Sequence, residues 1–248
     1  MSADRFLRTR QILGDEALAR LGAAHVAVVG IGAVGSYATE ALARSGVGHL
    51  RLVDGDLVQP SNINRQLMAL ESTLGRPKVD VAAARVVDIN PQCAVEPLRL
   101  FVDADSLGPV LTAPLDLVVD AIDSAGPKLE LIAAALRSGI PIVSSMGAAL
   151  RVDPTRVRTG VIADVQGCPL ARRLRRGLRG RGLGLDVPCV FSEEPATRAW
   201  IGPSEDPQGP GPTARRRALG SLPTVTGTFG LVLAALALRM LSVERPGP

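Results

Sequence analysis

Aromatic residues are scarce in this sequence. One Trp, one Tyr and four Phe make up 2% of the 248 residues, although 46% of all residues are hydrophobic. The core must therefore be built mainly from Ala, Val, Leu and Ile. Proteins that bind single-stranded nucleic acid without sequence preference stack successive bases on aromatic side chains. The composition excludes a surface of that kind, while the length suits one large domain that buries its own core.

Cysteine is also scarce. Cys93, Cys168 and Cys189 are widely separated, and no Cys-x-x-Cys pair occurs. This excludes a disulfide framework and a paired-cysteine zinc site. We therefore expect a cytoplasmic protein, since a reducing compartment suits free thiols. Residues 1–11 are polar and Arg-rich with no apolar run behind them, so we expect no signal peptide.

Long apolar runs are missing as well. The longest stretch, Phe229–Leu238, is only half as long as a membrane span. We interpret it as a buried C-terminal helix and expect no obligate membrane attachment.

Lysine is nearly absent, because Lys78 and Lys128 are the only two in the chain. The formal net charge is +4, but residues 151–182 contain nine Arg and two Asp, which gives this stretch +7 and leaves −3 for the rest. A basic segment on a neutral to acidic body suggests a polyanionic partner. The alternative is that this sequence simply uses Arg wherever it needs a surface cation.

Short apolar runs alternate with segments of helical spacing over the first 150 residues. The expected strands cover 25–30, 49–53, 94–100, 115–119 and 140–144. The expected helices cover 15–21, 35–45, 78–89 and 127–138. This alternation predicts an α/β fold with a doubly wound, mostly parallel, Rossmann-like sheet.

The pattern changes after Gly147. Residues 151–163 are expected to add antiparallel strands, and 169–178 to form a basic helix. Residues 195–217 contain five Pro and a triple Arg, which is typical of a long loop. We therefore divide the chain into a nucleotide-binding core, 1–150, and a C-terminal part of the same domain, 151–248, with an antiparallel and helical elaboration.

A glycine motif stands where the first strand should pass into a helix. Gly30, Gly32 and Gly35 form G-x-G-x-x-G, in which the glycines allow a tight turn and a close approach of backbone N–H groups to a phosphate. Asp54, at the end of the next strand, could bind ribose hydroxyls. By itself this motif would suggest NAD.

Three further features favour a triphosphate over NAD. The run NINRQ brings Asn62 and Arg65 beside the glycine loop, and Lys78 opens the next helix after GRP. The cations Arg65 and Lys78 could stabilise a reacting α-phosphate. We expect both at exposed positions. Asp120 and Asp123 end a strand at the ligand-binding edge of the sheet, where carboxylates suit Mg²⁺.

The runs VVGIGAVGS, LVDGD, NINRQ, GRPK, INP and DAIDS together resemble the ubiquitin-activating-enzyme-like superfamily of ThiF/MoeB-type adenylyltransferases. The resemblance implies an enzyme that uses ATP and Mg²⁺ to adenylylate a carboxylate. It implies Arg65, Lys78 and Asp123 as catalytic residues, with Asp123 also linked to the metal. The nucleotide-binding residues that it implies are Gly30, Gly32, Gly35, Asp54, Asp56, Asn62, Arg65, Lys78 and Asp123. It also implies a homodimer in which an N-terminal arginine, Arg8 or else Arg5, reaches the ATP of the partner subunit.

Later segments resemble the branch of this superfamily that dehydrates threonylcarbamoyladenosine in tRNA. They are DPT at 153–155, PLA at 169–171, CVFSE at 189–193 and TGTFG at 226–230. The resemblance implies ring closure of the modified adenosine through an acyl adenylate. It also implies that a basic helix grips tRNA phosphates with Arg172, Arg173, Arg175, Arg176 and Arg179.

Two other functions stay open. The chain could adenylylate the C-terminus of a sulfur-carrier-like protein, although those relatives typically carry Cys-x-x-Cys pairs. It could also be a non-catalytic dinucleotide-binding or redox-sensing module. Cys189 could trap an adenylate as a thioester, but a buried structural role is the simpler interpretation. Some relatives use a sulfur-transfer or redox partner protein, and residues 195–217 depart most from the pattern of the family.

Overall fold

Seven strands form one sheet in the computed structural model, which describes residues 4–196 and 219–243. The strands lie in the order β3-β2-β1-β4-β5-β7-β6, and only β6 runs antiparallel to its neighbour. Their bounds are β1 His25–Val29, β2 His49–Val53, β3 Ala94–Leu98, β4 Leu117–Asp120, β5 Ile142–Ser145, β6 Val157–Val161 and β7 Pro188–Ser192. The predicted α/β class and mostly parallel sheet are therefore confirmed.

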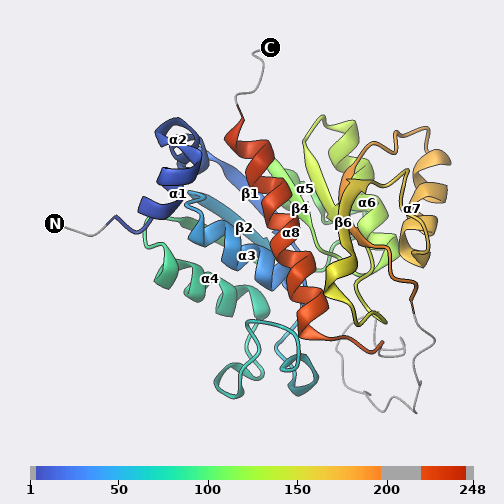
Figure 1. The fold of residues 1–248 in the computed structure, drawn as a ribbon, viewed down its shortest axis with the longest axis horizontal. Coiled ribbons are helices and arrows are strands. Elements are labelled where there is room, and N and C mark those ends of the chain that lie inside the picture. Colours follow the sequence, from blue (N-terminus) through green and yellow to red (C-terminus); the bar gives the residue numbers. More distant parts are fainter. Residues whose placement is uncertain (1–3, 197–218, 244–248) are drawn as a thin grey trace.

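Helices cover both faces of the sheet (Figure 1). One face packs against α3, α4 and α8, and the other against α5, α6 and α7. The helix bounds are α1 Leu7–Leu13, α2 Asp15–Ala23, α3 Gly35–Arg44, α4 Lys78–Ile89, α5 Leu107–Leu111, α6 Ala125–Arg137, α7 Pro169–Arg179 and α8 Pro223–Ser242. Short 3-10 turns lie at η1 Pro60–Asn62, η2 Glu71–Thr73 and η3 Pro154–Arg156.

The core is aliphatic, as the composition predicts. In β1 the four residues after His25 are all buried, because this central strand has helices on both faces. In contrast, β3 lies at the sheet edge, is mostly exposed and contains Pro97, a residue that edge strands tolerate.

The C-terminal part joins the same sheet as the first 150 residues. Strand β7 pairs with β5 on one side and with β6 on the other. The antiparallel prediction for 151–163 is confirmed by β6. The sequence did not lead us to expect α1, α5, β7 or the three 3-10 turns.

Helix α8 contains the predicted buried stretch Phe229–Leu238 and extends it in both directions. Its length and apolarity would suffice to cross a membrane, but half of the apolar window is buried inside the protein. It packs closely on α3: a Cβ atom on Gly230 would lie 2.4 Å from the Val34 carbonyl oxygen. The TGTFG motif therefore allows α8 to press against the start of α3, beside the glycine loop.

Candidate active site

The glycine loop connects β1 to α3, and each glycine meets a different constraint. Gly30 has a φ of +89°, which favours glycine. At Gly35 a Cβ would lie 1.7 Å from the Gly30 carbonyl oxygen, so only glycine lets helix and strand meet here. At Gly32 the nearest atom is Gln66 Nε2, at 3.8 Å from a built Cβ. Packing therefore does not require glycine at this position, and the missing side chain leaves the backbone open to an approaching group.

Asp54 follows β2 and forms a hydrogen bond with the glycine loop. Its Oδ2 accepts the Ile31 N–H at 2.7 Å, and its Oδ1 accepts the Asp56 N–H at 2.8 Å. Burial raises the pKa of Asp54, against the opposing effects of Lys78 and of these two N–H donors. Each carboxylate oxygen can accept a second hydrogen bond, so ribose recognition remains compatible with the fold.

Lys78 begins α4, but it is not at the exposed position that the sequence suggested. Only 5% of the residue is exposed. Its Nζ lies 2.8 Å from Asp56 Oδ2, and its backbone N–H donates to the Asp56 carbonyl oxygen. The Asp56 side chain is 43% exposed. The ammonium has three donors, so it can bind Asp56 and still present N–H groups to a phosphate.

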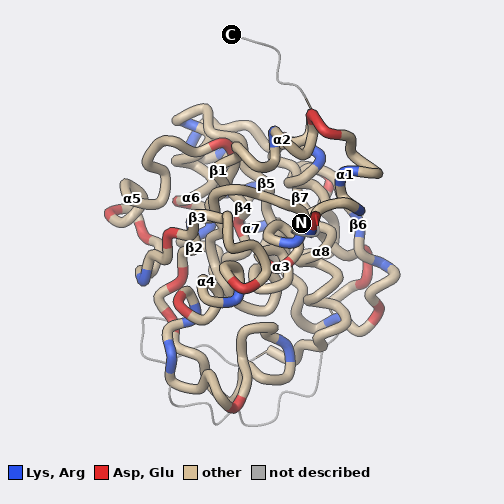
Figure 2. The backbone as a smooth tube through the Cα atoms, turned by 90° about the vertical axis from the view of Figure 1, so that its left-hand side faces the viewer, with Lys and Arg blue, Asp and Glu red and all other residues tan. Residues whose placement is uncertain are grey.

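The segment between β2 and α4 carries Asn62 and Arg65. It projects beyond the carboxyl ends of the strands, at the bottom of Figures 1 and 2. Asn62 is buried and its Oδ1 accepts the Gln59 N–H at 3.1 Å, so its oxygen closes a turn. Arg65 is half-buried and its Nη1 donates to the Ser61 carbonyl oxygen and to Asn64 Oδ1, both at 2.7 Å.

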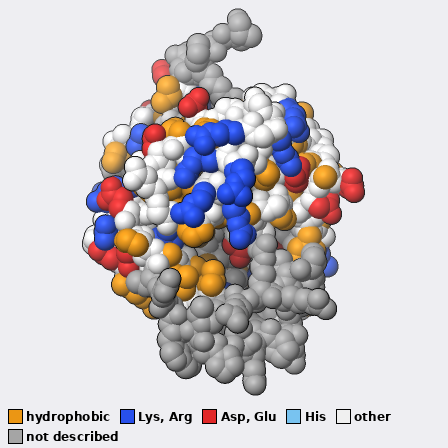
Figure 3. Space-filling view, turned by 90° about the vertical axis from the view of Figure 1, so that its right-hand side faces the viewer, with side chains coloured by type: hydrophobic (Ala, Val, Ile, Leu, Met, Phe, Trp, Pro, Cys, Tyr) orange, Lys and Arg blue, Asp and Glu red, His pale blue; other side chains and the backbone are white. Residues whose placement is uncertain are grey.

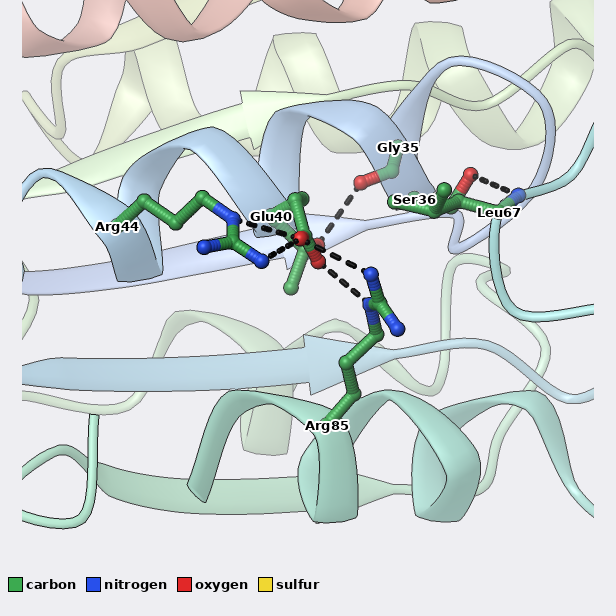
Figure 4. Close-up of polar contacts among 7 residues, drawn as sticks. Gly35, Ser36, Glu40, Arg44, Leu67 and Arg85 are labelled. Atoms are coloured by element: carbon green, nitrogen blue, oxygen red, sulfur yellow. Dashed lines mark hydrogen bonds and ion pairs between the residues drawn. The ribbon is translucent and has the colours of Figure 1, made fainter. Parts of the chain in front are cut away.

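Ser36, in the first turn of α3, ties this segment to the glycine loop. Its Oγ accepts the Leu67 N–H at 3.1 Å, as Figure 4 shows. Ser36 is fully buried, and the bond as a whole is partly buried. It brings the polar residues just before Leu67 next to Gly32 and Gly35. Sequence reasoning did not identify Ser36, because a lone Ser in a helix has no distinctive pattern.

Glu40 joins α3 to α4 (Figure 4). Its carboxylate accepts from Arg44 Nε at 2.7 Å and from Arg85 Nε at 2.6 Å. Burial would raise the pKa of Glu40, but the hydrogen bonds from Arg85 and Arg44 outweigh it and lower that pKa. Glu40 thereby fixes the position of α3, which begins at Gly35, relative to α4, which begins at Lys78.

Asp120 and Asp123 end up in opposite environments. Asp120 is fully buried and pairs with Lys128 Nζ at 2.8 Å, while its Oδ2 also accepts the Ser144 hydroxyl at 2.7 Å. It is therefore not available as a metal ligand, contrary to the suggestion that both carboxylates could bind Mg²⁺. Asp123 is exposed at the same sheet edge, where it can meet a ligand.

Lys128 is the residue that sequence reasoning missed most clearly. It lies in α6 with no exposed surface, and its Nζ also donates to the Ile122 carbonyl oxygen at 2.9 Å. It thus supports the turn that leads to Asp123. A signal was available, since one of only two lysines stands in a mostly apolar helix eight residues after the strand-ending Asp120.

The N-terminal arginines lie far from the glycine loop of their own chain. A Cβ on Gly46, just after α3, would contact Phe6, whereas the glycine loop is at the start of that helix. The ten residues of α3 span about 15 Å. Arg8 is exposed on α1, and Arg5 Nη1 donates to the Ile89 carbonyl oxygen at the end of α4. Neither arginine is brought to the site within one chain.

The basic helix α7 carries its arginines on two sides. Arg175 is half-buried and its Nη1 donates to the carbonyl oxygens of Ile162 and Val165. The other predicted members are exposed: Arg172, Arg173, Arg176 and Arg179. Figure 3 shows cationic side chains gathered on the face of the molecule that carries α7. Arg175 anchors the helix, and the four exposed arginines are not needed for that contact.

Cys189 lies in β7 with no exposed surface, and burial raises the pKa of its thiol to about 12. Cys93 and Cys168 are buried too. We therefore expect that a thiol reagent such as DTNB labels none of the three in the native protein at pH 8 and all three in guanidinium chloride, and that Cys189→Ala retains full activity. Rapid native labelling, or loss of activity in Cys189→Ala with the fold intact, would restore a nucleophilic role.

Comparison with known proteins gives a consistent result. The ThiF family profile matches residues 4–247. The tRNA threonylcarbamoyladenosine dehydratase of Bacillus subtilis (strain 168) is 45% identical over 77% of this chain and 75% of its own. The enzyme of that name from Escherichia coli (strain K12) is 38% identical over 97% of this chain and 94% of its own.

Solved structures agree with the sequence comparison. The E. coli dehydratase TcdA in complex with ATP superposes with a TM-score of 0.85 at 37% identity, covering 96% of this chain and 93% of that one. The match extends over both the sheet and the C-terminal elements, at an identity well above the level at which only folds are shared. This chain therefore belongs to the ThiF family.

Proposed function

We propose that this protein dehydrates threonylcarbamoyladenosine in tRNA, using ATP to activate the carboxylate of the modified base. One observation carries the proposal. The glycine loop, the Lys78–Asp56 pair, the Arg65 segment and Asp123 converge on one edge of the sheet, in a chain that is similar to named dehydratases over nearly its full length. A nucleotide and a second anionic group can meet there.

The chemistry takes two steps. A carboxylate oxygen of the threonylcarbamoyl group attacks the α-phosphorus of ATP, and pyrophosphate leaves, which gives an acyl adenylate. The carbamoyl group then attacks the activated carbonyl carbon, a ring closes and AMP leaves. The base loses one water in total. The second step is intramolecular, so correct positioning supplies much of its rate, and no enzyme nucleophile is required.

The charged residues at the sheet edge suit the first step. Substrate carboxylate and phosphates repel one another, so cations in a partly dry site must offset the charge that develops at the α-phosphate. Lys78 can do this from its buried position, and Arg65 from the segment tied to Ser36. Asp54 would accept the ribose hydroxyls, with Asp56 orienting Lys78 and Asn62 shaping the loop.

The residues present fit Mg²⁺ through Asp123. No group of three or more His, Cys, Asp or Glu able to hold a metal occurs within residues 4–196 and 219–243. However, Mg²⁺ is commonly bound by one or two carboxylates together with substrate phosphates. Asp123 would hold the ion beside the nucleotide, where its charge would neutralise phosphate oxygens. Asp120 would contribute only through the buried network behind that turn.

A homodimer would complete the site. Helix α1 buries none of its residues, and Ile12 is 81% exposed. Leu7 and Leu13 of the same helix are exposed as well, and apolar side chains gathered on one exposed element suit a subunit interface. Arg8 lies on this helix, far from its own glycine loop, so it could serve as a cation for the ATP of a partner subunit.

Helix α7 is the proposed tRNA-binding element. Replacing Arg172, Arg173, Arg176 and Arg179 by Ala should weaken tRNA binding and flatten its salt dependence, by about 0.7–0.9 in the log–log slope for each phosphate that is no longer neutralised. Fluorescence anisotropy at several salt concentrations measures this. The control replaces Arg99 and Arg239, which are exposed on other elements. Equal slopes in both variants would remove α7 from the interface.

A sulfur-carrier adenylyltransferase remains the second candidate. It would use the same ATP site but need a partner protein with a free C-terminal glycine, and it would not need the arginines of α7. We also propose a cytoplasmic location, in keeping with three free cysteines, and leave room for a sulfur-transfer or redox partner. The contribution of 195–217 falls mostly outside the described residues.

The deciding measurement is AMP release from ATP–Mg²⁺, with and without tRNA that carries threonylcarbamoyladenosine, followed by mass analysis of the nucleoside. We expect release that depends on the modified tRNA, with a loss of about 18 Da for the one water that ring closure removes. AMP release that is indifferent to tRNA would favour the carrier-protein function.

A further inference from the structure

Arg151 is a buried cation with an unused donor. It lies beyond the end of β5 and is 3% exposed. Its Nε donates to the Glu194 carbonyl oxygen at 3.1 Å, and its Nη1 to the Ala149 carbonyl oxygen at 3.0 Å. Its Nη2 is buried and has no hydrogen-bond partner among the described residues. Because unmet donors on a buried charge are costly, this arginine is poorly explained by packing alone.

Neutral carbonyl oxygens are the only acceptors that hold the guanidinium within 4–196 and 219–243, and no carboxylate in those ranges forms an ion pair with it. Glu194 is buried nearby, but its carboxylate accepts the backbone N–H groups of Val152 and Asp153 at 2.9–3.1 Å. The positive charge of Arg151 is therefore left without a bonded anion in this part of the chain. A buried guanidinium in this state is a natural partner for an oxyanion.

The start of α7 lies beside this guanidinium. A Cβ on Gly147 would be 3.9 Å from Arg151 Nη1, 3.5 Å from Cys168 Sγ and 3.9 Å from Leu170 Cβ. Helix α7 has no side-chain cap and no acidic residue in its first turn. The N-terminus of a helix carries partial positive charge and attracts anions. Two independent features thus favour negative charge at the same place.

The position suits the second substrate better than ATP. Strand β5 is separated from β1 by β4 alone, which corresponds to about 10 Å at the usual strand spacing. A carboxylate attached at the α-phosphate of a nucleotide on the loop after β1 approaches the segment after β5 if it extends across β4. The group that reaches Arg151 is then part of the RNA nucleotide being activated.

We propose that Arg151 forms an anion subsite for a carboxylate or phosphate oxygen of the modified nucleotide. The inference rests on the proposed function and adds a residue to it. Nη2 is enclosed, so entry of the anion requires the groups around it to shift. Once bound, the anion would accept from Nη2 and lie near the N-terminus of α7.

The test compares Arg151→Gln and Arg151→Lys with the unaltered protein. We measure binding of tRNA with and without the threonylcarbamoyl group, in the presence of AMP. Loss of a charged hydrogen bond should weaken binding of the modified RNA by roughly tenfold or more in Arg151→Gln. Arg151→Lys should retain most of the affinity. ATP affinity should stay unchanged in both, which separates this effect from damage to the nucleotide site.

The pattern of loss identifies the anion. Weakened binding of the modified RNA alone points to the carboxylate, and equal weakening of both RNAs points to a backbone phosphate. If Arg151→Gln binds both RNAs as the unaltered protein does, the subsite is wrong.

A separate experiment tests the anion subsite in case the proposed function is wrong. If the unaltered protein does not bind the modified RNA, inorganic phosphate is titrated under saturating AMP and the melting temperature is followed. A smaller stabilisation of Arg151→Gln than of the unaltered protein supports an anion subsite, whereas equal stabilisation overturns it.

Discussion

Replacing Lys78 by alanine is expected to lower kcat for AMP formation by at least about a hundredfold, the usual loss when a transition-state cation or donor is removed. Lys78 is the cation with the most enclosed position at the proposed nucleotide site. Its partner Asp56 is 43% exposed and can be solvated by water after the change. The fold should therefore survive, and the melting temperature should change little while activity is lost.

Arg76→Ala provides the control for this variant. Arg76 lies two residues earlier, carries the same charge and is exposed, so its removal should leave AMP formation nearly unchanged. Steady-state AMP release and thermal unfolding are measured for both variants. Normal AMP formation in Lys78→Ala would show that Lys78 serves the fold and that the phosphate cation lies elsewhere.

Replacing Lys128 by methionine should instead destabilise the fold. The Lys128–Asp120 pair has no exposed surface, so the change leaves Asp120 as a buried carboxylate with only the Ser144 hydroxyl and the Ile122 N–H as donors among the described residues. Breaking a buried ion pair by removing one partner typically costs about 3–5 kcal/mol. The free energy of unfolding, measured in urea, should fall by about that amount.

A double variant distinguishes charge from packing. Asp120→Leu combined with Lys128→Met removes both charges and fills similar volume, which is often neutral or stabilising for buried pairs. We expect it to recover most of the stability that Lys128→Met loses. If the double variant is as unstable as Lys128→Met, the damage comes from the packing of the lysine stem or from the unpaired Ile122 carbonyl oxygen, and the ion pair is not the cause. The charge of Lys128 would then not serve the fold, and the contrast that we infer with the catalytic charge of Lys78 would be weaker.

Much of the fold could be predicted from the sequence because its signals are local. An apolar run that ends in glycine, as at Gly30, marks a buried strand and its turn, and helix α4 was predicted with its observed bounds, Lys78–Ile89. Strand β7 could not be assigned in the same way. It pairs with β5, more than 40 residues earlier in the chain, and its place between β5 and β6 depends on pairings that no local pattern encodes.

The same distinction between local signals and tertiary contacts applies to the candidate site. The sequence by itself determined which chemical groups are available: three glycines, the aspartates at the ends of two strands and the two lysines. Only the tertiary structure decided their roles. It buried Asp120 against Lys128, left Asp123 exposed, and enclosed Lys78 beside Asp56. The physical reason is that ionisation and ligand binding depend on burial and on charged neighbours, and both are set by residues that meet only when the sheet assembles.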